Sequence, residues 1–245
     1  MKGVKFKLWG QVAHFLQAAY SVYWATYPVP PRTVLQGIVG AILGMDKDTP
    51  QVALEDAHFA VSGAIPVIHH HTGNLRKNPV PSIKAKYSVA AMEKYRGRVG
   101  KHFKVQTTQI RQEWLFNPKF VVFAHLPEEY HDEFVRRLKN QEFVYSPYLG
   151  KTGMFACLEF LSEGEFEPLP EGQYEIETVV RNTRDTKLTL SSGMEIQSIV
   201  MPWAVDPERV FTTCPDPYLI QRDGKPIPVS TSDAYQFQGQ PLMFL

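Results

Sequence analysis

The feature that most constrains the fold is a basic segment, His69–Lys104, which lies between two regions with regular hydrophobic patterns. The segment contains nine Lys and Arg residues and a single acid, Glu93. Charged side chains are almost never fully buried unless they are paired, so this segment cannot form part of a core. We therefore expect it to leave the compact body as a long polar insertion, and such insertions are usually functional or disordered.

The charge of the chain is strongly segregated although the net charge is only +1. Glu159–Glu177 contains seven glutamates and no base, in contrast to the basic segment. A basic segment on a near-neutral protein is typical of a local binding site for a polyanion. The alternative is a solvated loop that happens to be basic.

The region before the insertion predicts strand, helix and strand. Val4–Leu8 alternates apolar residues with lysines, which indicates a strand with one buried face. Apolar residues at helical spacing over Val34–Ile42 predict a helix, with Thr33 as its N-cap and Gly44 at its end. A second alternating strand is predicted over Phe59–Val67.

Two glycines, Gly37 and Gly40, lie inside the first predicted helix. Each costs roughly 1 kcal/mol relative to alanine, so some contact should offset that cost. Tight packing is the favoured explanation, and close approach to a partner or a phosphate is the other.

The region after the insertion repeats the pattern. It predicts a strand at Ile110–Phe116, a turn at Asn117-Pro118, a strand at Lys119–His125, a helix that opens at Pro127, and a strand at Met154–Leu161. The complete order is strand, helix, strand, insertion, strand, helix, strand. This order matches the ferredoxin-like (RRM-like) βαββαβ module, so the predicted fold class is α+β.

The C-terminal part is predicted to be rich in short strands. These are expected at Tyr174–Val180, Met194–Met201 and Arg209–Thr213, with a hairpin over Leu219–Pro228 around Asp223-Gly224. The predicted domains are a ferredoxin-like domain over residues 1–165, with the basic insertion at 69–109, and a β-rich region over 166–245 packed on it.

Several classes of protein are disfavoured by the sequence. The only cysteines, Cys157 and Cys214, form no CxxC pair, and no stretch is apolar enough to cross a membrane, so the cytoplasm is the expected location. His69–His71 lacks a cysteine or carboxylate at ligand spacing. Gly150-Lys151-Thr152 lacks the rest of a phosphate-binding loop. No metal or cofactor is expected.

The first 44 residues resemble the N-terminal signature of a known family. The matching features are Leu8-Trp9-Gly10, then Ala13 and Phe15, then Tyr27–Thr33, and then the glycine-bearing helix Gly37–Gly44. The loop Tyr148–Lys151 is a weaker second match. In this order they resemble the fifth CRISPR-associated (Cas) family, a branch of the RAMP superfamily.

The resemblance implies a fold, a function and a set of partners. It implies a RAMP-type body in a type I Cascade surveillance complex, which grips the 5′ handle of the CRISPR guide RNA (crRNA) and caps the backbone filament in antiviral defence. Implied partners are the crRNA, the repeating backbone subunit and the large subunit, with target DNA reached indirectly through the complex and no membrane. A projecting thumb of this family should coincide with the basic insertion.

Residue chemistry and the resemblance together suggest the RNA-binding side chains. Lys and Arg neutralise phosphates, whereas aromatic rings stack on the bases of single strands. The candidates lie in the insertion and in loops beside the family motifs: His14, Arg32, Arg76, Lys77, Lys84, Lys86, Tyr87, Arg96, Arg98, Lys101, His102, Lys104, Tyr148 and Lys151.

Catalysis is the alternative to a purely binding role. One branch of the resembled family cleaves its own precursor crRNA within the repeat, without a metal, using a tyrosine, a lysine and a histidine. Lys101-His102 resembles the basic pair of that branch, but Met45–Asp48 stands where the tyrosine is expected. We therefore expect a non-catalytic subunit, with an endoribonuclease that uses Lys101 and His102 as the alternative.

Overall fold

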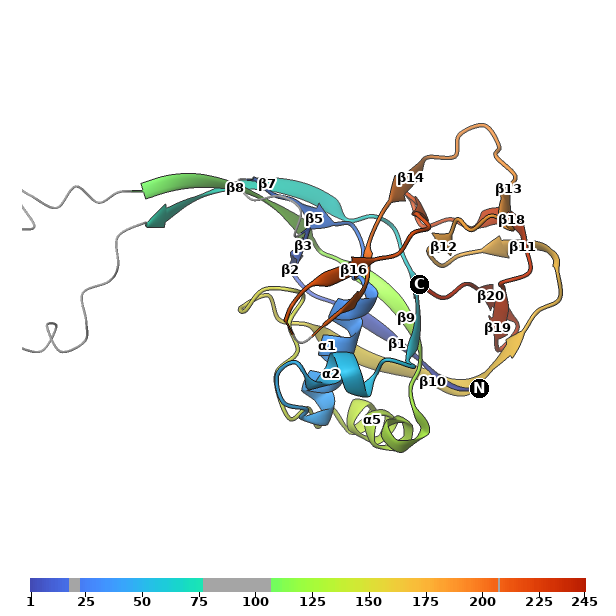
Figure 1. The fold of residues 1–245 in the computed structure, drawn as a ribbon, viewed down its shortest axis with the longest axis horizontal. Coiled ribbons are helices and arrows are strands. Elements are labelled where there is room, and N and C mark those ends of the chain that lie inside the picture. The colour runs from blue at the N-terminus through green and yellow to red at the C-terminus, as the bar shows by residue number, and fades with distance from the viewer. Residues whose placement is uncertain (18–22, 77–106, 207) are drawn as a thin grey trace, which may run out of the picture.

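The computed structural model describes residues 1–17, 23–76, 107–206 and 208–245. The protein is a mixed α and β structure, rich in strands and with few helices among these residues. A compact body holds the helices, and a ribbon of two long strands projects from it (Figure 1). No helix within the described ranges is long and apolar enough to cross a membrane.

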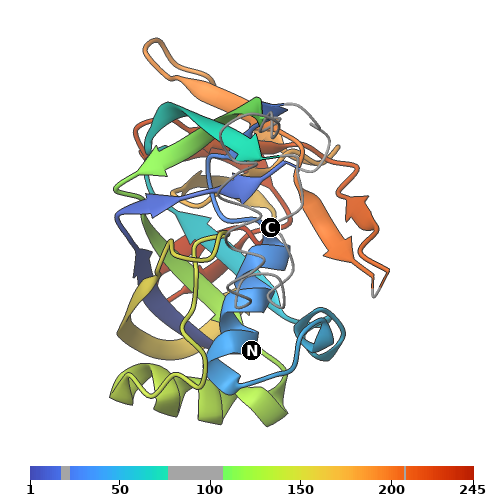
Figure 2. The same ribbon diagram turned by 90° about the vertical axis from the view of Figure 1, so that its left-hand side faces the viewer.

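The body is built on an antiparallel sheet in which strands from both ends of the chain meet. The helices α1 and α5 lie against this sheet (Figures 1 and 2), and the rings of Phe6 and Phe134 meet edge to face at 5.8 Å. The alternation in β1 buries Val4, Phe6 and Leu8, as predicted. In sheet order the strands are β20 (Gln240–Leu242), β19 (Tyr235–Phe237), β10 (Cys157–Pro168), β1 (Lys2–Trp9), β9 (Lys119–His125) and β6 (His58–Ser62).

Helix α1 (Arg32–Leu43) begins earlier than predicted. Its N-cap is Pro31, whose carbonyl accepts from Leu35 N at 3.1 Å, so the prediction of Thr33 as the N-cap is wrong. The extended backbone that proline favours already supplies the geometry of a cap. The end of the helix is confirmed, because Gly44 adopts the left-handed conformation (φ 81°).

The two glycines of α1 differ in their surroundings. A Cβ on Gly40 would lie 2.2 Å from the side chain of Pro50 at the start of α2 (Thr49–Ala53), so close helix packing explains that glycine. A Cβ on Gly37 would meet nothing within 4 Å, so packing does not explain that one.

The strand predicted over Phe59–Val67 is not continuous: it covers most of β6, a connecting segment, and the first residue of β7 (Val67–Arg76). Strand β6 ends at Ser62, and Gly63 (φ 141°) turns the chain away from the sheet. The chain then passes through Ile65, whose N–H donates to Arg222 O at 2.9 Å, and enters β7.

The elements predicted after the insertion are confirmed. The structure has β8 (Thr107–Phe116), a turn with Asn117 at φ 49°, β9, and α5 (Glu128–Asn140) with Pro127 as its N-cap. Strand β10 begins later than predicted, at Cys157, and continues to Pro168.

The C-terminal region is strand-rich as predicted, but the hairpin over Leu219–Pro228 is wrong. The two strands on either side of Asp223-Gly224 belong to different sheets, β17 pairing with β12 and β14, and β18 with β11 and β13. The strands are β11 (Gly172–Ile176), β12 (Val180–Arg181), β13 (Lys187–Leu188), β14 (Ile196–Ile199), β15 (Pro202–Val205), β16 (Phe211–Thr213), β17 (Tyr218–Gln221) and β18 (Ile227–Thr231).

The expected division between residues 165 and 166 falls inside β10. The far end of β10 pairs with β19, and Phe166 packs on Phe237 with 4.9 Å between ring centroids. The division into two domains stays a prediction.

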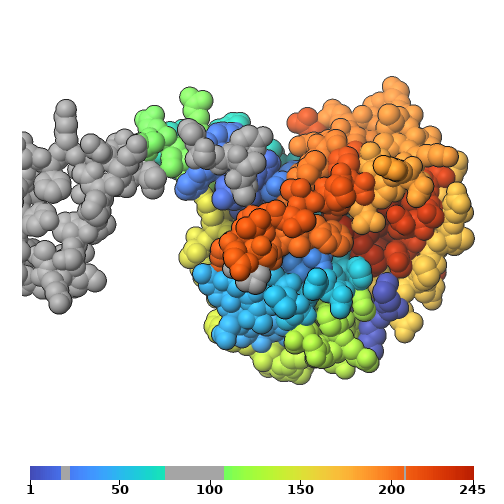
Figure 3. Space-filling model, in the orientation of Figure 1, coloured from blue at the N-terminus to red at the C-terminus, as the bar shows by residue number. Residues whose placement is uncertain are grey.

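The projecting ribbon, called the arm below, consists of β7 and β8. The two strands pair in a continuous antiparallel register from Val67↔Phe116 to Arg76↔Thr107. On its other edge, β8 pairs with β2 (Val12–Ala13) and β4 (Tyr23–Trp24), while β3 (Phe15–Leu16) pairs with β5 (Thr26–Tyr27) beside them. The end of the arm stands away from the body in the space-filling view (Figure 3).

The insertion predicted over residues 69–109 therefore begins inside β7 and ends inside β8. Its first residues are regular β-structure and not an irregular loop, because the cross-strand register continues through them. Residues 77–106 lie outside the described part of the chain.

Candidate nucleic-acid interface

The arm has two different faces, because paired residues of an antiparallel ladder share a face and neighbouring residues along a strand alternate. The stacking face carries aromatic rings and one amide: His69, His71, Gln112, Trp114 and Phe116. The polar face carries His70, Thr72, Arg111 and Glu113. Consecutive residues of His69–His71 thus divide between the two faces.

The stacking face presents rings that are accessible to a ligand. His71 stacks on Trp114 with centroids 4.5 Å apart and planes 23° apart, and His69 lies 4.8 Å from Phe116. Both histidines are exposed, and Phe116 keeps 45% of its surface in solvent. Exposed flat rings in a row form a platform on which unpaired bases can stack.

A lysine stands beside this platform. Lys151 Nζ lies 4.2 Å above the ring of Trp24 and donates to Gln112 Oε1 at 2.6 Å. Trp114 Nε1 also donates to Gln112 Oε1, at 3.4 Å. Partial burial lowers the pKa of Lys151. No carboxylate of the described chain forms an ion pair with its ammonium group, which therefore remains available to a phosphate.

The loop that carries Lys151 is held against the body by Gly150. Gly150 has φ 94°, and a Cβ there would lie 1.9 Å from His14 O, so only glycine fits. His14 N donates to Leu149 O at 3.0 Å, which fixes the same loop to the chain after β2. These contacts place Lys151 beside the arm.

The polar face is organised by Tyr23. Its hydroxyl donates to Glu113 Oε1 in a short hydrogen bond, and it also contacts His70 Nδ1 at 3.2 Å. The second oxygen of Glu113 accepts from Thr26 N at 2.9 Å. Burial, reinforced by the bond to Glu113, raises the pKa of Tyr23 to about 12.

Two of the RNA-binding residues expected from the sequence are buried. His14 is 0% exposed, with Nδ1 2.6 Å from Glu113 O, and burial lowers its pKa. Arg32 is 4% exposed, and its guanidinium donates to carbonyls that include Trp203 O at 3.0 Å and Ala57 O at 3.2 Å. RNA could reach either side chain only if the core opened, so these two expectations are corrected.

The remaining candidates divide by position. Lys151 lies beside the arm, and Tyr148 is half-buried against Phe155, 5.2 Å between centroids. For Arg76 the structure gives the backbone position at the end of β7. The others lie outside the described residues, and their RNA contacts stay predictions: Lys77, Lys84, Lys86, Tyr87, Arg96, Arg98, Lys101, His102 and Lys104.

Five residues of this interface were not predicted from the sequence, namely Tyr23, Trp24, Gln112, Glu113 and Trp114. A signal was present in the alternation of Gln112, Trp114 and Phe116 within a strand that was correctly predicted. This alternation indicates a binding face only when the pairing of β8 with the histidines of β7 is known, and the sequence placed those histidines in the insertion.

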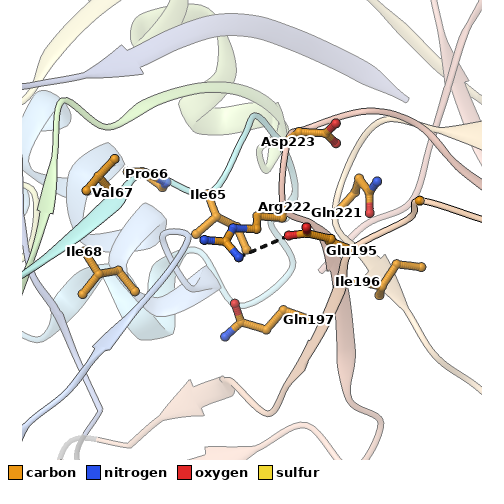
Figure 4. A pocket seen from close by; sticks show the side chains of 11 residues that line it. Ile65, Pro66, Val67, Ile68, Glu195, Ile196, Gln197, Gln221, Arg222 and Asp223 are labelled. Carbon is orange, nitrogen blue, oxygen red and sulfur yellow. Dashed lines mark hydrogen bonds and ion pairs between the residues drawn. The ribbon is translucent and has the colours of Figure 1, made fainter.

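A groove of about 1080 Å³ lies where the root of the arm approaches the C-terminal strands (Figure 4). Ile65, Val67 and Ile196 line it, and its Arg222 and Glu195 pair with each other at 3.1 Å. A small-molecule site needs polar groups that converge on a ligand. This groove instead has mutually paired charges, so the arm is the stronger candidate.

Within the part of the chain that the structure describes, one group of residues has metal-ligand chemistry, namely His131, Asp132 and Glu163. Lys139 already binds Glu163 at 3.0 Å, and Lys2 binds Asp132 at 3.5 Å. Because two ammonium groups neutralise these carboxylates, the group resembles an ordinary surface ion-pair network.

Comparison with known proteins identifies the family. The family model described as "CRISPR-associated protein (Cas_Cas5)" matches residues 3–186. No curated protein matches the chain. Among solved structures, "Crystal structure of a CRISPR protein from Archaeoglobus fulgidus" superimposes with a TM-score of 0.56 at 14% identity, covering 98% of each chain.

A second solved structure, "CRISPR RNA-guided surveillance complex", superimposes with a TM-score of 0.50 at 17% identity, covering 92% of this chain and 91% of the other. At such identities the likeness concerns the fold. The family itself follows from the sequence model, which covers most of the chain. The chain therefore belongs to the Cas5 family of CRISPR-associated proteins.

Proposed function

We propose that the chain is an RNA-binding subunit of a CRISPR effector complex, which holds crRNA on the stacking face of its arm. The observation that carries the proposal is the row of accessible rings with Lys151 beside it. Single-stranded RNA is bound by aromatic stacking and by cations along its backbone, and the arm offers both. The solved structure entitled "CRISPR RNA-guided surveillance complex", which has a similar fold, supports membership of such an assembly.

We propose a finer role as well, on the basis of the resemblance described for the sequence. In our proposal the complex is a type I Cascade, the bound segment is the 5′ handle, and the subunit caps the backbone filament in the cytoplasm. Its neighbours are the repeating backbone subunit and the large subunit, which reaches the DNA target. The basic residues of the insertion at 77–106, which lie outside the described part of the chain, supply further phosphate-binding cations in this proposal.

The proposed body is a RAMP-type ferredoxin-like module. The sheet order β10-β1-β9-β6, all antiparallel, supports it, because α1 connects β1 to β6 and α5 connects β9 to β10. This is the arrangement of a βαββαβ unit in which the fourth and third strands flank the first. The arm leaves the module between its second and third strands.

The binding proposal is tested with the full chain and single-stranded repeat RNA, by fluorescence anisotropy over a range of salt. Loss of one stacked ring costs about 1–3 kcal/mol, so Trp114→Ala should weaken binding roughly fivefold to 150-fold. Lys151→Ala should reduce the salt slope by about 0.7, the share of one phosphate contact on a single strand.

The matched control is Lys7→Ala, which removes an exposed lysine of the body that pairs with Glu159 at 3.1 Å. It should leave both the affinity and the salt slope unchanged. Wild-type affinity in Trp114→Ala and in Lys151→Ala would place the RNA elsewhere.

The absence of catalysis is also a proposal. The full chain, incubated with repeat RNA and EDTA, should leave the RNA intact. Specific cleavage that disappears in His102→Ala would overturn this part and would favour the endoribonuclease alternative, with Lys101 and His102 as its residues.

A further inference from the structure

The polar face of the arm presents a histidine whose ring is held in one tautomer. The hydroxyl of Tyr23 has one proton, and it donates that proton to Glu113. The contact of 3.2 Å between this hydroxyl and His70 Nδ1 is therefore a hydrogen bond in which Nδ1–H is the donor. The neutral imidazole then carries its lone pair on Nε2.

The lone pair of His70 faces solvent. His70 is exposed, and among the described residues no group forms a hydrogen bond with its Nε2. Tyr23 supplies both contacts that position the ring, the hydrogen bond to its hydroxyl and a ring contact with centroids 6.5 Å and planes 29° apart. The pairings His70↔Glu113 and Tyr23↔Arg111 place the three side chains on one face of the arm, with Tyr23 one pair farther out than the other two.

An uncharged acceptor selects which part of an RNA strand it can contact. Phosphate oxygens have no proton to donate, so Nε2 can accept only from a ribose 2′-hydroxyl or from a base N–H. The carboxylate of Glu113 on the same face further disfavours a phosphate at this place. Arg111, exposed on the same face one pair farther out, can hold the neighbouring phosphate.

We propose that His70 reads a hydrogen-bond donor of the bound RNA through Nε2, and that Tyr23 and Glu113 are positioning residues that fix its tautomer. The inference rests on the proposed RNA-binding function and adds a specificity-determining residue to it. In this proposal the polar face recognises a hydrogen-bond donor of the RNA, while the opposite face supplies the stacking and phosphate contacts.

The test uses the full chain with three short probes: oligouridine RNA, the same oligomer with deoxyribose, and oligouridine methylated at N3. These probes remove the 2′-hydroxyl and the base N–H separately. His70→Ala should weaken binding of oligouridine about twofold to 13-fold, the effect of one hydrogen bond. It should also abolish discrimination against one modified probe, which identifies the ribose or the base as the donor.

Two further variants separate recognition from packing. His70→Gln, which restores an acceptor near the position of Nε2, should recover part of the discrimination. Tyr23→Phe should remove the fixed tautomer, visible by NMR of the ring nitrogens, and reduce discrimination while the salt slope stays unchanged. The control His125→Ala, in β9 of the body, should behave like the wild type.

The outcomes are distinguishable. If His70→Ala discriminates among the three probes as the wild type does, or loses affinity equally for all three, this inference fails while RNA binding stands. If the wild-type chain binds none of the probes and no repeat RNA, the proposed function itself fails.

Discussion

The body and the arm share the same alternation of side chains along their strands, but the apolar face is buried in the body and exposed in the arm. In β1 of the body, Phe6 is 1% exposed because α5 covers its face of the sheet. In β8 of the arm, Phe116 follows the same alternation and remains 45% exposed. A pattern of period two therefore predicts a strand but not what covers its apolar face. In the arm, we infer, RNA provides that cover.

The largest effect expected from this comparison concerns stability. Phe134→Ala removes a fully buried ring that contacts Phe6, and it should lower the free energy of unfolding by about 3–5 kcal/mol. Trp114→Ala in the arm should lower it by less, because that ring packs against the core but keeps part of its surface in solvent. Urea denaturation measures both. Equal losses would mean that the arm is part of the folding core.

An intermediate effect concerns the loop between the two regions. Gly150 and Gly153 both have positive φ, but only at Gly150 would a Cβ collide with backbone, at His14 O. Gly153→Ala should cost about 1–2 kcal/mol from the left-handed conformation alone. Gly150→Ala should cost more and should also weaken RNA binding, because Lys151 is displaced. Denaturation and RNA titration of both variants check this, and identical behaviour would remove the loop from the interface.

The smallest effect concerns the surface of the body. The hydrogen bond from Arg136, together with Arg137, lowers the pKa of Glu133 to about 2. Because the folded-state pKa is depressed, the stabilisation is complete above about pH 4.5 and is lost as the pH falls toward 2. Glu133→Gln should flatten the pH dependence of stability slightly in that window. Since the pair is exposed, added salt should weaken the effect, and a salt-independent change would contradict a surface origin.

The elements of the body could be predicted from the sequence because their signals are local. The alternation in β1, the pattern of β9 and the proline before α5 each specify their own element. The failures involve partners distant in sequence. The sequence around Asp223-Gly224 predicts a hairpin, yet the strand on each side pairs with strands from an earlier part of the chain.

The candidate site was only partly predictable for the same reason. Lys151 was predicted from its loop and lies beside the arm, whereas His14 and Arg32 were predicted as polar residues near family motifs and are buried. A polar residue in a motif can serve the core as well as a ligand, and Arg32 binds backbone carbonyls. The stacking of His71 on Trp114 depends on a cross-strand register that no local pattern encodes.

Photo-crosslinking of thiouridine-containing repeat RNA to the full chain, followed by peptide mapping, would locate the bound RNA on the protein. We expect crosslinks on the stacking face of the arm, at Trp114, His71 or Phe116, and in the peptide that carries Lys151. Crosslinks confined to the body, for example to α5 or to the outer strands β19 and β20, would contradict it.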